Sequence, residues 1–227
     1  MTNRYYGQWS PQVDRVLYEN YFKDVRDGFF IECGAGDGIA DNNTKFFEDS
    51  LGWNGVCIEP STVSFGQLIK RRPNTKNLML GLSDKDGSIT FTEATNRSNL
   101  SGGAVQYHPR LKSFVSSCGY AFRDITIETM KYSTLLTTLD IPKVNLLTID
   151  VEGHEAAVID GMMGAKLPDV ICIEYTCAGI NRVKRLLTEL GYRFDFISFN
   201  NAYFSIGVPE KTWFGVTAVM GCFDDEK

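Results

Sequence analysis

Short runs of apolar residues alternate along this chain with longer segments in which apolar residues recur every three or four positions. The short runs have the length of β-strands and the longer segments have the period of α-helices. This alternation is typical of a parallel sheet covered by helices, so the predicted fold class is α/β. The predicted strands are Phe29–Cys33, Gly55–Glu59, Asn77–Leu82, Val144–Asp150 and Val170–Tyr175, and the predicted helices are Asn43–Ser50, Ser61–Arg71, Glu155–Met163 and Ile180–Leu190.

The last part of the chain shows strand-like runs without helices between them. Tyr192–Phe199 and Tyr203–Ile206 flank the turn-forming pair Asn200-Asn201, and a further run covers Gly215–Phe223. Two runs joined by such a turn indicate a β-hairpin. We therefore expect a mixed sheet, mostly parallel, with an antiparallel hairpin at one edge.

One stretch between the third and fourth parallel strands lacks a clear period. It contains the polar segment Thr95–Gly103, with the sequence TNRSNLSGG. We interpret this stretch as a long irregular connection, and connections of this length are commonly functional loops.

Composition narrows the class of protein. The 227 residues are 43% hydrophobic and 22% charged, which is typical of a soluble chain with one core, so a single domain over residues 1–227 is expected. The net charge of −5 disfavours nucleic acid as a partner. No apolar run is long enough for a signal peptide or a membrane span, and the six cysteines contain no CxxC pair. We expect a cytoplasmic protein with reduced, mostly buried cysteines.

The most informative segment is FFIECGAGDG, in which a strand is followed by Gly34, Gly36 and Gly38. Glycines at alternate positions let the backbone bend sharply and approach a ligand closely, so a nucleotide-cofactor turn is predicted. The dinucleotide pattern GxGxxG would require glycine where Ile39 stands. NAD is therefore a poor fit.

Two carboxylates flank this turn in the predicted sheet. Glu59, at the end of the second strand, is placed to accept hydrogen bonds from both hydroxyls of a ribose. Glu32, just before the glycines, would repel a pyrophosphate but suits a cationic ligand. S-adenosylmethionine carries a ribose, an ammonium and a sulfonium and has no phosphate, so it is the predicted cofactor. Either residue alone is also explained as a solvated strand end.

Further polar residues are expected at the same edge of the sheet, where ligands of open α/β folds bind. Ser83 and Asp84 follow the third strand and are candidates for an adenine contact, although a plain surface turn is an equal alternative. His154 is one of two histidines and is flanked by acids, so it is the candidate general base. Asp150 would orient it or contact the cofactor, and is the next choice as base. Glu174 is a candidate for the base or for acceptor binding.

The segment around Asp150 also contains enough oxygen and nitrogen ligands for a divalent metal. Residues two apart on a strand point to the same face but lie about 7 Å apart, so Asp150 and Glu152 converge on one ion only if the chain turns between them. We therefore expect no required metal. The acceptor is expected to contact residues outside the cofactor half of the chain, for which the candidates are Ser98, Asn99, Ser101, Tyr107 and Glu174.

With these residues identified, the chain resembles the FkbM family of S-adenosylmethionine-dependent O-methyltransferases. The resemblance covers roughly residues 6–206 and rests on ordered blocks: YGQW, GFFIECGAGDG, NNTKFFE with LGWNGVCIEP, LGLSDKDG, and LLTIDVEGHE leading into VIDGM. It implies a class I methyltransferase fold, with seven mostly parallel strands and helices on both faces. The cofactor roles that it implies fall on Glu32, Gly34, Gly36, Gly38, Glu59 and Asp84. The expected cofactor site also includes Asp37, Pro60, Ser83 and Asp150.

The resemblance also implies methyl transfer to a hydroxyl group, and we expect a sugar or glycan acceptor. A macrolide or other small-molecule hydroxyl remains an alternative, as do an NAD-dependent sugar oxidoreductase and an inactive cofactor-binding module. The N-terminal segment, about residues 1–26, includes Gln8 and Trp9 and is expected to form a helical lid over the cofactor. The chain is also compatible with one domain of a larger glycan-assembly enzyme, or with a glycosyltransferase partner.

Overall fold

The computed structural model describes residues 4–95, 101–104 and 109–218 of the chain. Its main sheet has seven strands in the order β10-β11-β9-β8-β1-β2-β3. The pairs from β9 to β3 are parallel, whereas β11 runs antiparallel to both β9 and β10. The mixed sheet with an antiparallel hairpin is therefore confirmed. The strands are β1 (Phe29–Cys33), β2 (Asn54–Ile58), β3 (Lys76–Leu78), β8 (Leu146–Ile149), β9 (Val170–Glu174), β10 (Arg193–Ser198) and β11 (Asn201–Ser205).

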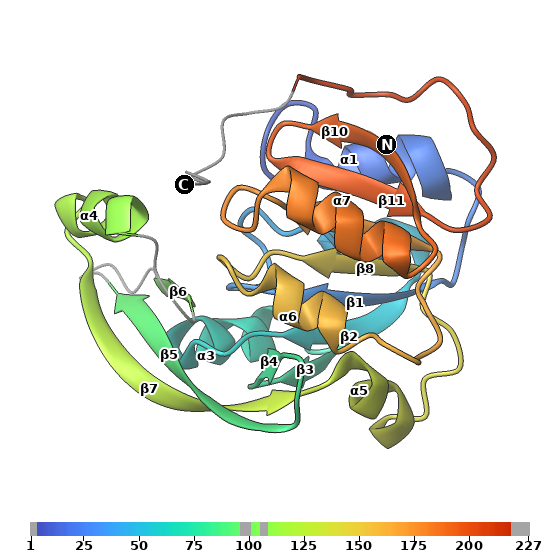
Figure 1. The fold of residues 1–227 in the computed structure, drawn as a ribbon. Helices are drawn as coiled ribbons and strands as arrows, with labels where there is room; N and C mark the ends of the chain where they lie inside the picture. Colours follow the sequence, from blue (N-terminus) through green and yellow to red (C-terminus); the bar gives the residue numbers. More distant parts are fainter. Residues whose placement is uncertain (1–3, 96–100, 105–108, 219–227) are drawn as a thin grey trace.

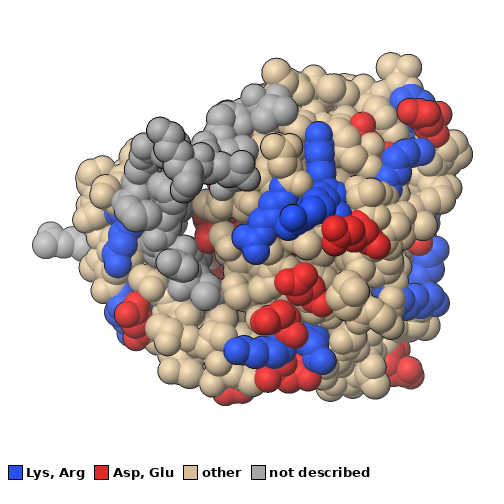
Figure 2. Space-filling model, viewed as in Figure 1, with Lys and Arg blue, Asp and Glu red and all other residues tan. Residues whose placement is uncertain are grey.

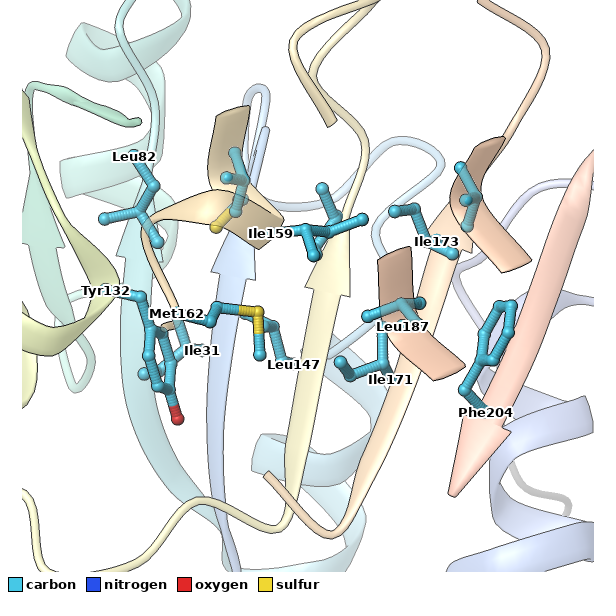
Figure 3. Packing of buried hydrophobic residues seen from close by; sticks show 14 of the residues in the cluster. Ile31, Leu82, Tyr132, Leu147, Ile159, Met162, Ile171, Ile173, Leu187 and Phe204 are labelled. Atoms are coloured by element: carbon cyan, nitrogen blue, oxygen red, sulfur yellow. The ribbon is translucent and has the colours of Figure 1, made fainter. Parts of the chain in front are cut away.

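Helices cover both faces of this sheet, as predicted (Figure 1). Neighbouring residues of a strand point to opposite faces, so Phe30 and Ile31 enter different cores. Ile31 packs with Met162 and Leu187 on one face (Figure 3), and Phe30 packs with Phe47 on the other. The helices are α1 (Val13–Leu17), the π-helical turn η1 (Tyr18–Phe22), α2 (Lys45–Leu51), α3 (Thr62–Arg71), α5 (Tyr132–Thr138), α6 (Glu155–Asp160) and α7 (Ile180–Glu189).

A second sheet of four strands projects from the main body (Figure 1). Its order is β4-β7-β5-β6, and β5 pairs with β7 over its whole length, from Gly87↔Thr129 to Thr95↔Ala121. The helix α4 lies at the far end of this arm (Figure 1). These elements are β4 (Gly81–Leu82), β5 (Gly87–Thr95), β6 (Ser101–Ala104), α4 (Pro109–Ser117) and β7 (Ala121–Met130).

The second sheet corrects two predictions. The connection before the fourth parallel strand is not irregular, because most of it forms β5, β6, α4 and β7. The predicted strand Asn77–Leu82 is also two strands, since β3 ends at Leu78 in the main sheet and β4 begins at Gly81 in the second. The chain bends at Met79 and Leu80 and so passes from one sheet to the other.

The end of the described chain differs from the prediction as well. Residues 215–218 form no strand, although Thr217 donates its amide hydrogen to the carbonyl of Ile197, 2.9 Å away. The rest of that predicted strand lies outside the described residues. The five cysteines in the described part of the chain are all free thiols. No helix among the described residues is long and apolar enough to cross a membrane.

The surface in the view of Figure 1 carries side chains of both signs. Lysine and arginine side chains gather over α7, and aspartate and glutamate side chains lie beside them (Figure 2). This mixed surface agrees with the modest net charge of −5.

Candidate functional site

A pocket lies where the carboxyl ends of β1, β2 and β8 meet the second sheet. The lining residues come from the glycine turn after β1, the ends of β2 and β8, and the apolar faces of β4, β5 and β7. They are Cys33, Gly34, Gly36, Ile58, Glu59, Pro60, Leu80, Gly81, Leu82, Ile89, Phe91, Ile127, Asp150, Val151, Glu152 and His154. Six of them, Gly34, Gly36, Glu59, Pro60, Asp150 and His154, belong to the site predicted from the sequence.

The glycine turn after β1 has the conformation that its sequence indicates. Gly34, Gly36 and Gly38 all adopt positive φ, at 83°, 55° and 83°. A Cβ atom on Gly34 would lie 1.8 Å from the carbonyl oxygen of Asp150. Only glycine fits there, and the close contact brings the ends of β1 and β8 together.

Glu59 connects the glycine turn to the start of α3. Its carboxylate accepts hydrogen bonds from the amides of Gly36 and Ser61, both at 2.8 Å. Burial raises the pKa of Glu59 to about 7, although these two amides favour the charged form. The side chain lines the pocket, as a ribose-binding residue must.

Glu32 occupies a different place. It is 2% exposed and is absent from the pocket lining. It accepts hydrogen bonds from Asn42 Nδ2 at 2.9 Å, the Asn43 amide at 2.9 Å and Thr44 Oγ1 at 2.7 Å. Its positive partner is the buried Arg72, whose Nη1 lies 3.5 Å from Oε2. The structure therefore gives Glu32 a set of partners within the protein, between the turn and α2.

Two other predicted cofactor residues also contact protein groups. Asp37 accepts hydrogen bonds from the amides of Ile39 and Ala40 at 2.8 and 2.9 Å and pairs with Arg71. Although burial raises the pKa of Asp37, these amides and Arg71 hold it below its usual value. A Cβ on Gly38 would meet the side chain of Arg72, at 2.7 Å from Cγ. Both residues shape the turn from outside the pocket lining.

Ser83, Asp84 and His154 form a hydrogen-bonded chain. The Ser83 hydroxyl donates to Asp84 Oδ1 at 2.9 Å and lies 2.9 Å from His154 Nε2. Because the hydroxyl hydrogen is used by Asp84, Nε2 of His154 is the donor to Ser83 Oγ, which assigns the tautomer. Burial lowers the pKa of His154, while Asp84 raises it to a smaller extent. His154, a lining residue, is thereby tied to Ser83, which is buried and absent from the pocket lining.

Four carboxylates gather at the ends of β8 and β9, and we call Asp150, Glu152, Glu155 and Glu174 the acidic cluster. β8 and β9 are parallel and pair Ile149 with Ile173, so Asp150 and Glu174 follow side by side. Glu152 has a positive φ of 53°, and Gly153 follows with 104°. The chain thus turns directly after Asp150, which is the condition for the two acids to converge.

Within the acidic cluster, one carboxylate oxygen each from Asp150, Glu152 and Glu174 lies within 4.8 Å of the others. Glu155 is 1% exposed; its Oε1 accepts the Gly153 amide hydrogen at 2.9 Å, and its Oε2 has no hydrogen-bond partner among the described residues. Burial and then the neighbouring carboxylates raise the pKa of Asp150 well above its usual range and that of Glu152 to about 8. Burial is also the main cause that raises the pKa of Glu155 to about 7, with a smaller effect of Glu174.

The N-terminal segment reaches this cluster through one asparagine. Trp9 Nε1 donates to Asn200 Oδ1 at 2.7 Å, and Asn200 Nδ2 donates to Glu174 Oε1 at 2.5 Å. The Trp9 ring also stacks on Phe199, with centroids 5.0 Å apart. Trp9 is thus placed over the turn of the β10–β11 hairpin, next to Glu174.

The apolar wall of the pocket was not predicted from the sequence. Ile89 and Phe91 of β5 and Ile127 of β7 line it from the second sheet. Their signal is visible in the sequence, because Ile89 and Phe91 alternate with Thr90 and Thr92 at the period of a strand. Of the predicted acceptor residues, Ser98, Asn99 and Tyr107 lie outside the described residues, and so does the side chain of Ser101.

The chain has a class I methyltransferase fold. This follows from the order of the seven strands, from the antiparallel hairpin, and from the glycine turn beside the acidic strand ends. The particular family follows from comparison with known sequences. The model described as "Methyltransferase FkbM domain" matches residues 32–194, and the chain belongs to the FkbM methyltransferase family.

A curated relative has a named substrate. The chain is 31% identical over 142 residues to the hexuronic acid methyltransferase AglP of Haloferax volcanii. The match covers 60% of this chain and 53% of AglP, so the chain spans about half the length of that relative.

Two solved structures are similar in outline. Precorrin-6y C5,15-methyltransferase from Geobacter metallireducens has a TM-score of 0.48 and 10% identity, with 90% of each chain covered. A fibrillarin/Nop5p complex has a TM-score of 0.40 and 10% identity, with 78% of this chain and 71% of that chain covered. Both likenesses are weak and add nothing to the family assignment.

Proposed function

We propose that this protein is an S-adenosylmethionine-dependent O-methyltransferase that acts on a hydroxyl group of a sugar or glycan. One observation carries the cofactor assignment. The acidic side chains in the described pocket lining are Glu59, Asp150 and Glu152, and no lysine or arginine is among them. A pyrophosphate would find no positive side chain there, whereas a sulfonium and an ammonium favour the charged forms of these acids.

The strand order supports an orientation of the cofactor. Glu59 is the proposed partner of the ribose hydroxyls, at the centre of the site. Adenine is proposed to lie against the apolar wall formed by Ile89 and Phe91, and Ser83, which follows β4 of the same sheet, is the proposed polar residue beside it. Asp150 and Glu174 lie on the β8 and β9 side. The sulfonium and the transferred methyl group are therefore proposed to face the acidic cluster.

The contacts of His154 change the choice of the general base. Its Nε2 is bonded to Ser83, a residue absent from the pocket lining, so this nitrogen is not directed at an acceptor in the pocket. Asp150 lies in the pocket lining on the methyl side. We therefore propose Asp150 as the base and His154 as a residue that supports the adenine side.

The proposed reaction is an in-line displacement. The acceptor oxygen attacks the methyl carbon, the sulfur–carbon bond breaks, and the sulfur keeps the electron pair as S-adenosylhomocysteine forms. The acceptor proton passes to an oxygen of Asp150, whose charged form is favoured when the sulfonium binds beside it. The pocket chiefly aligns the two reacting atoms, and such a base contributes roughly a hundredfold to ten-thousandfold.

The sugar acceptor is proposed from the family and from the named substrate of AglP. A panel should therefore contain free and nucleotide-linked sugars, with hexuronic acids beside the matching neutral hexoses. Transfer from methyl-labelled S-adenosylmethionine to a sugar hydroxyl is the expected result. Label found only on a macrolide or other non-sugar hydroxyl would replace the acceptor, and no transfer to any acceptor despite cofactor binding would indicate an inactive module.

Calorimetry tests the cofactor assignment separately. S-adenosylhomocysteine should bind and NAD should give no heat. Glu59→Gln should weaken S-adenosylhomocysteine about 10-fold to 100-fold, because hydrogen bonds to a charged group contribute roughly 1.5–3 kcal/mol. Glu128→Gln, at an exposed position of β7, is the control and should bind like the wild type. Clear binding of NAD without binding of S-adenosylhomocysteine would overturn the proposal.

A further inference from the structure

The acidic cluster contains an arrangement that methyl transfer by itself does not explain. Three of its carboxylates, Asp150, Glu152 and Glu174, place one oxygen each within 4.8 Å of the others. Like charges at such a separation repel one another strongly when they are shielded from water. No salt bridge to lysine or arginine reaches any of the three within the described part of the chain.

The backbone within this cluster is held in a costly conformation. Glu152 has a φ of 53°, in the left-handed region that non-glycine residues avoid at a cost of roughly 1–2 kcal/mol. Strain of this kind persists where surrounding contacts impose it, and it is concentrated at functional sites.

A second observation, independent of the three oxygens, is a buried carboxylate oxygen of Glu155 that lacks a partner among the described residues. Glu155 begins α6 directly after the turn and is 1% exposed. Its Oε2 is buried without a hydrogen-bond partner among the described residues. Its charge acts on both Asp150 and Glu152, so the side chain belongs to the same cluster. Buried polar atoms in proteins are nearly always satisfied, by water or an ion where the protein offers no partner.

We propose that Asp150, Glu152 and Glu174 bind one divalent cation, with the Glu155 carboxylate as an outer negative charge that strengthens its binding. Oxygens that bind Ca²⁺ lie about 2.3–2.6 Å from the ion and those that bind Mg²⁺ about 2.0–2.1 Å, so ligands on opposite sides are about 4–5 Å apart. The observed limit of 4.8 Å agrees with this span. An all-oxygen set selects hard cations such as Mg²⁺, Mn²⁺ or Ca²⁺ over Zn²⁺.

Cation binding is compatible with the proposed base. Each ligand contributes one carboxylate oxygen, and the second oxygen of Asp150 keeps its lone pairs as a proton acceptor. The cation inference does not rest on the proposed function, because all its ligands belong to this chain. Its test therefore needs neither methyl donor nor acceptor.

The test is titration of the chelator-treated protein with Mn²⁺ alone, followed by the electron paramagnetic resonance signal of free Mn²⁺. One ion per chain should bind, with a dissociation constant of about 10⁻⁵ to 10⁻³ M. Asp150→Asn and Glu174→Gln should each weaken binding at least tenfold. Asp160→Asn, which removes the same charge from an exposed position of α6, should bind like the wild type.

Thermal unfolding with Mg²⁺ or Ca²⁺ gives a second readout that also reports whether the variants fold. The cation should raise the melting temperature of the wild type and of Asp160→Asn, but not of the two ligand variants. The inference would be overturned if no Mn²⁺ bound at millimolar concentration, or if Asp160→Asn lost as much Mn²⁺ affinity as the two ligand variants. Methyl transfer that persists in such a case would leave the proposed function intact.

Discussion

Replacement of Glu32 separates a cofactor role from a structural one. The sequence favours Glu32 as the partner of a cationic ligand, but the structure buries it against Arg72, with Nη1 3.5 Å from Oε2. Glu32→Gln keeps the shape and removes the charge. Its new amide group would face Asn42 Nδ2, which already donates to Glu32 and also to the carbonyl of Ala35. A reversal of the Asn42 amide is prevented, because Asn42 Oδ1 accepts from Lys45 and Arg72.

The expected cost follows from these contacts. Breaking a buried ion pair costs roughly 3–5 kcal/mol, but Arg72 retains its pairing with Glu48, which reduces the loss. We expect Glu32→Gln to lower the free energy of unfolding by about 2–4 kcal/mol, measured by urea denaturation. Because proteins of this kind are stable by about 5–15 kcal/mol, the variant should still fold.

Cofactor affinity is the decisive second measurement. Glu32 is absent from the pocket lining, so S-adenosylhomocysteine should bind Glu32→Gln within about threefold of the wild type. Glu48→Gln is the matched control, since it removes the other carboxylate that pairs with Arg72 and is more distant from the turn. It should be less destabilising and should bind equally well. Wild-type stability together with a tenfold loss of affinity in Glu32→Gln would refute this reasoning.

Three further predictions concern the glycine turn, the histidine and the N-terminal segment. Gly34→Ala should abolish S-adenosylhomocysteine binding in calorimetry, because its Cβ would lie 1.8 Å from the carbonyl oxygen of Asp150. A Cβ on Gly36 would meet no atom within 4 Å, so Gly36→Ala should lower the free energy of unfolding only by the roughly 1–2 kcal/mol of its positive φ, measured by thermal unfolding. Equal effects of the two substitutions would contradict this difference. His154→Ala should weaken the cofactor about threefold to thirtyfold and change the saturated rate little, whereas a rate loss of roughly a hundredfold or more at unchanged affinity would restore His154 as the base. Burial raises the pKa of Asp14 from 3.8 to about 6. Between these two pH values the folded protein binds a proton that the unfolded chain has lost, and this proton binding stabilises the folded state. The stabilisation is present at low pH and disappears as the pH rises through about 6. Between pH 5 and 7.5 the wild type should therefore lose roughly 1 kcal/mol more than Asp14→Asn in urea denaturation, and parallel pH profiles would argue against it.

The main sheet was predictable because its strands are buried on both faces and read as continuous apolar runs. β1 has the predicted bounds, and β2, β8 and β9 differ from prediction by one or two residues at their ends. The second sheet was not recognised because β5 and β7 expose one face. Their alternation of Ile and Phe with Thr and charged residues is weaker than an apolar run, and the polar segment between them resembles a loop.

The residues of the candidate site that lie at strand ends were predictable from the sequence. Gly34, Glu59 and Asp150 follow directly from the order of strands and lie in the pocket. The environment of Glu32 was not predictable, because its partner Arg72 comes from the end of α3 and looks like an ordinary basic helix end in the sequence. Burial of that arginine depends on how α3 packs against the turn, which no local pattern reports.

The second sheet gives the pocket a property that the main sheet cannot supply. The ends of β1, β2 and β8 contribute a glycine turn and carboxylates, which are the proposed partners of the ribose and cationic groups but offer little surface to a flat aromatic base. Ile89, Phe91 and Ile127 supply that surface from the arm. The same sheet continues beyond the main body toward α4 (Figure 1). Substitutions of these three residues of β5 and β7 should therefore weaken cofactor binding.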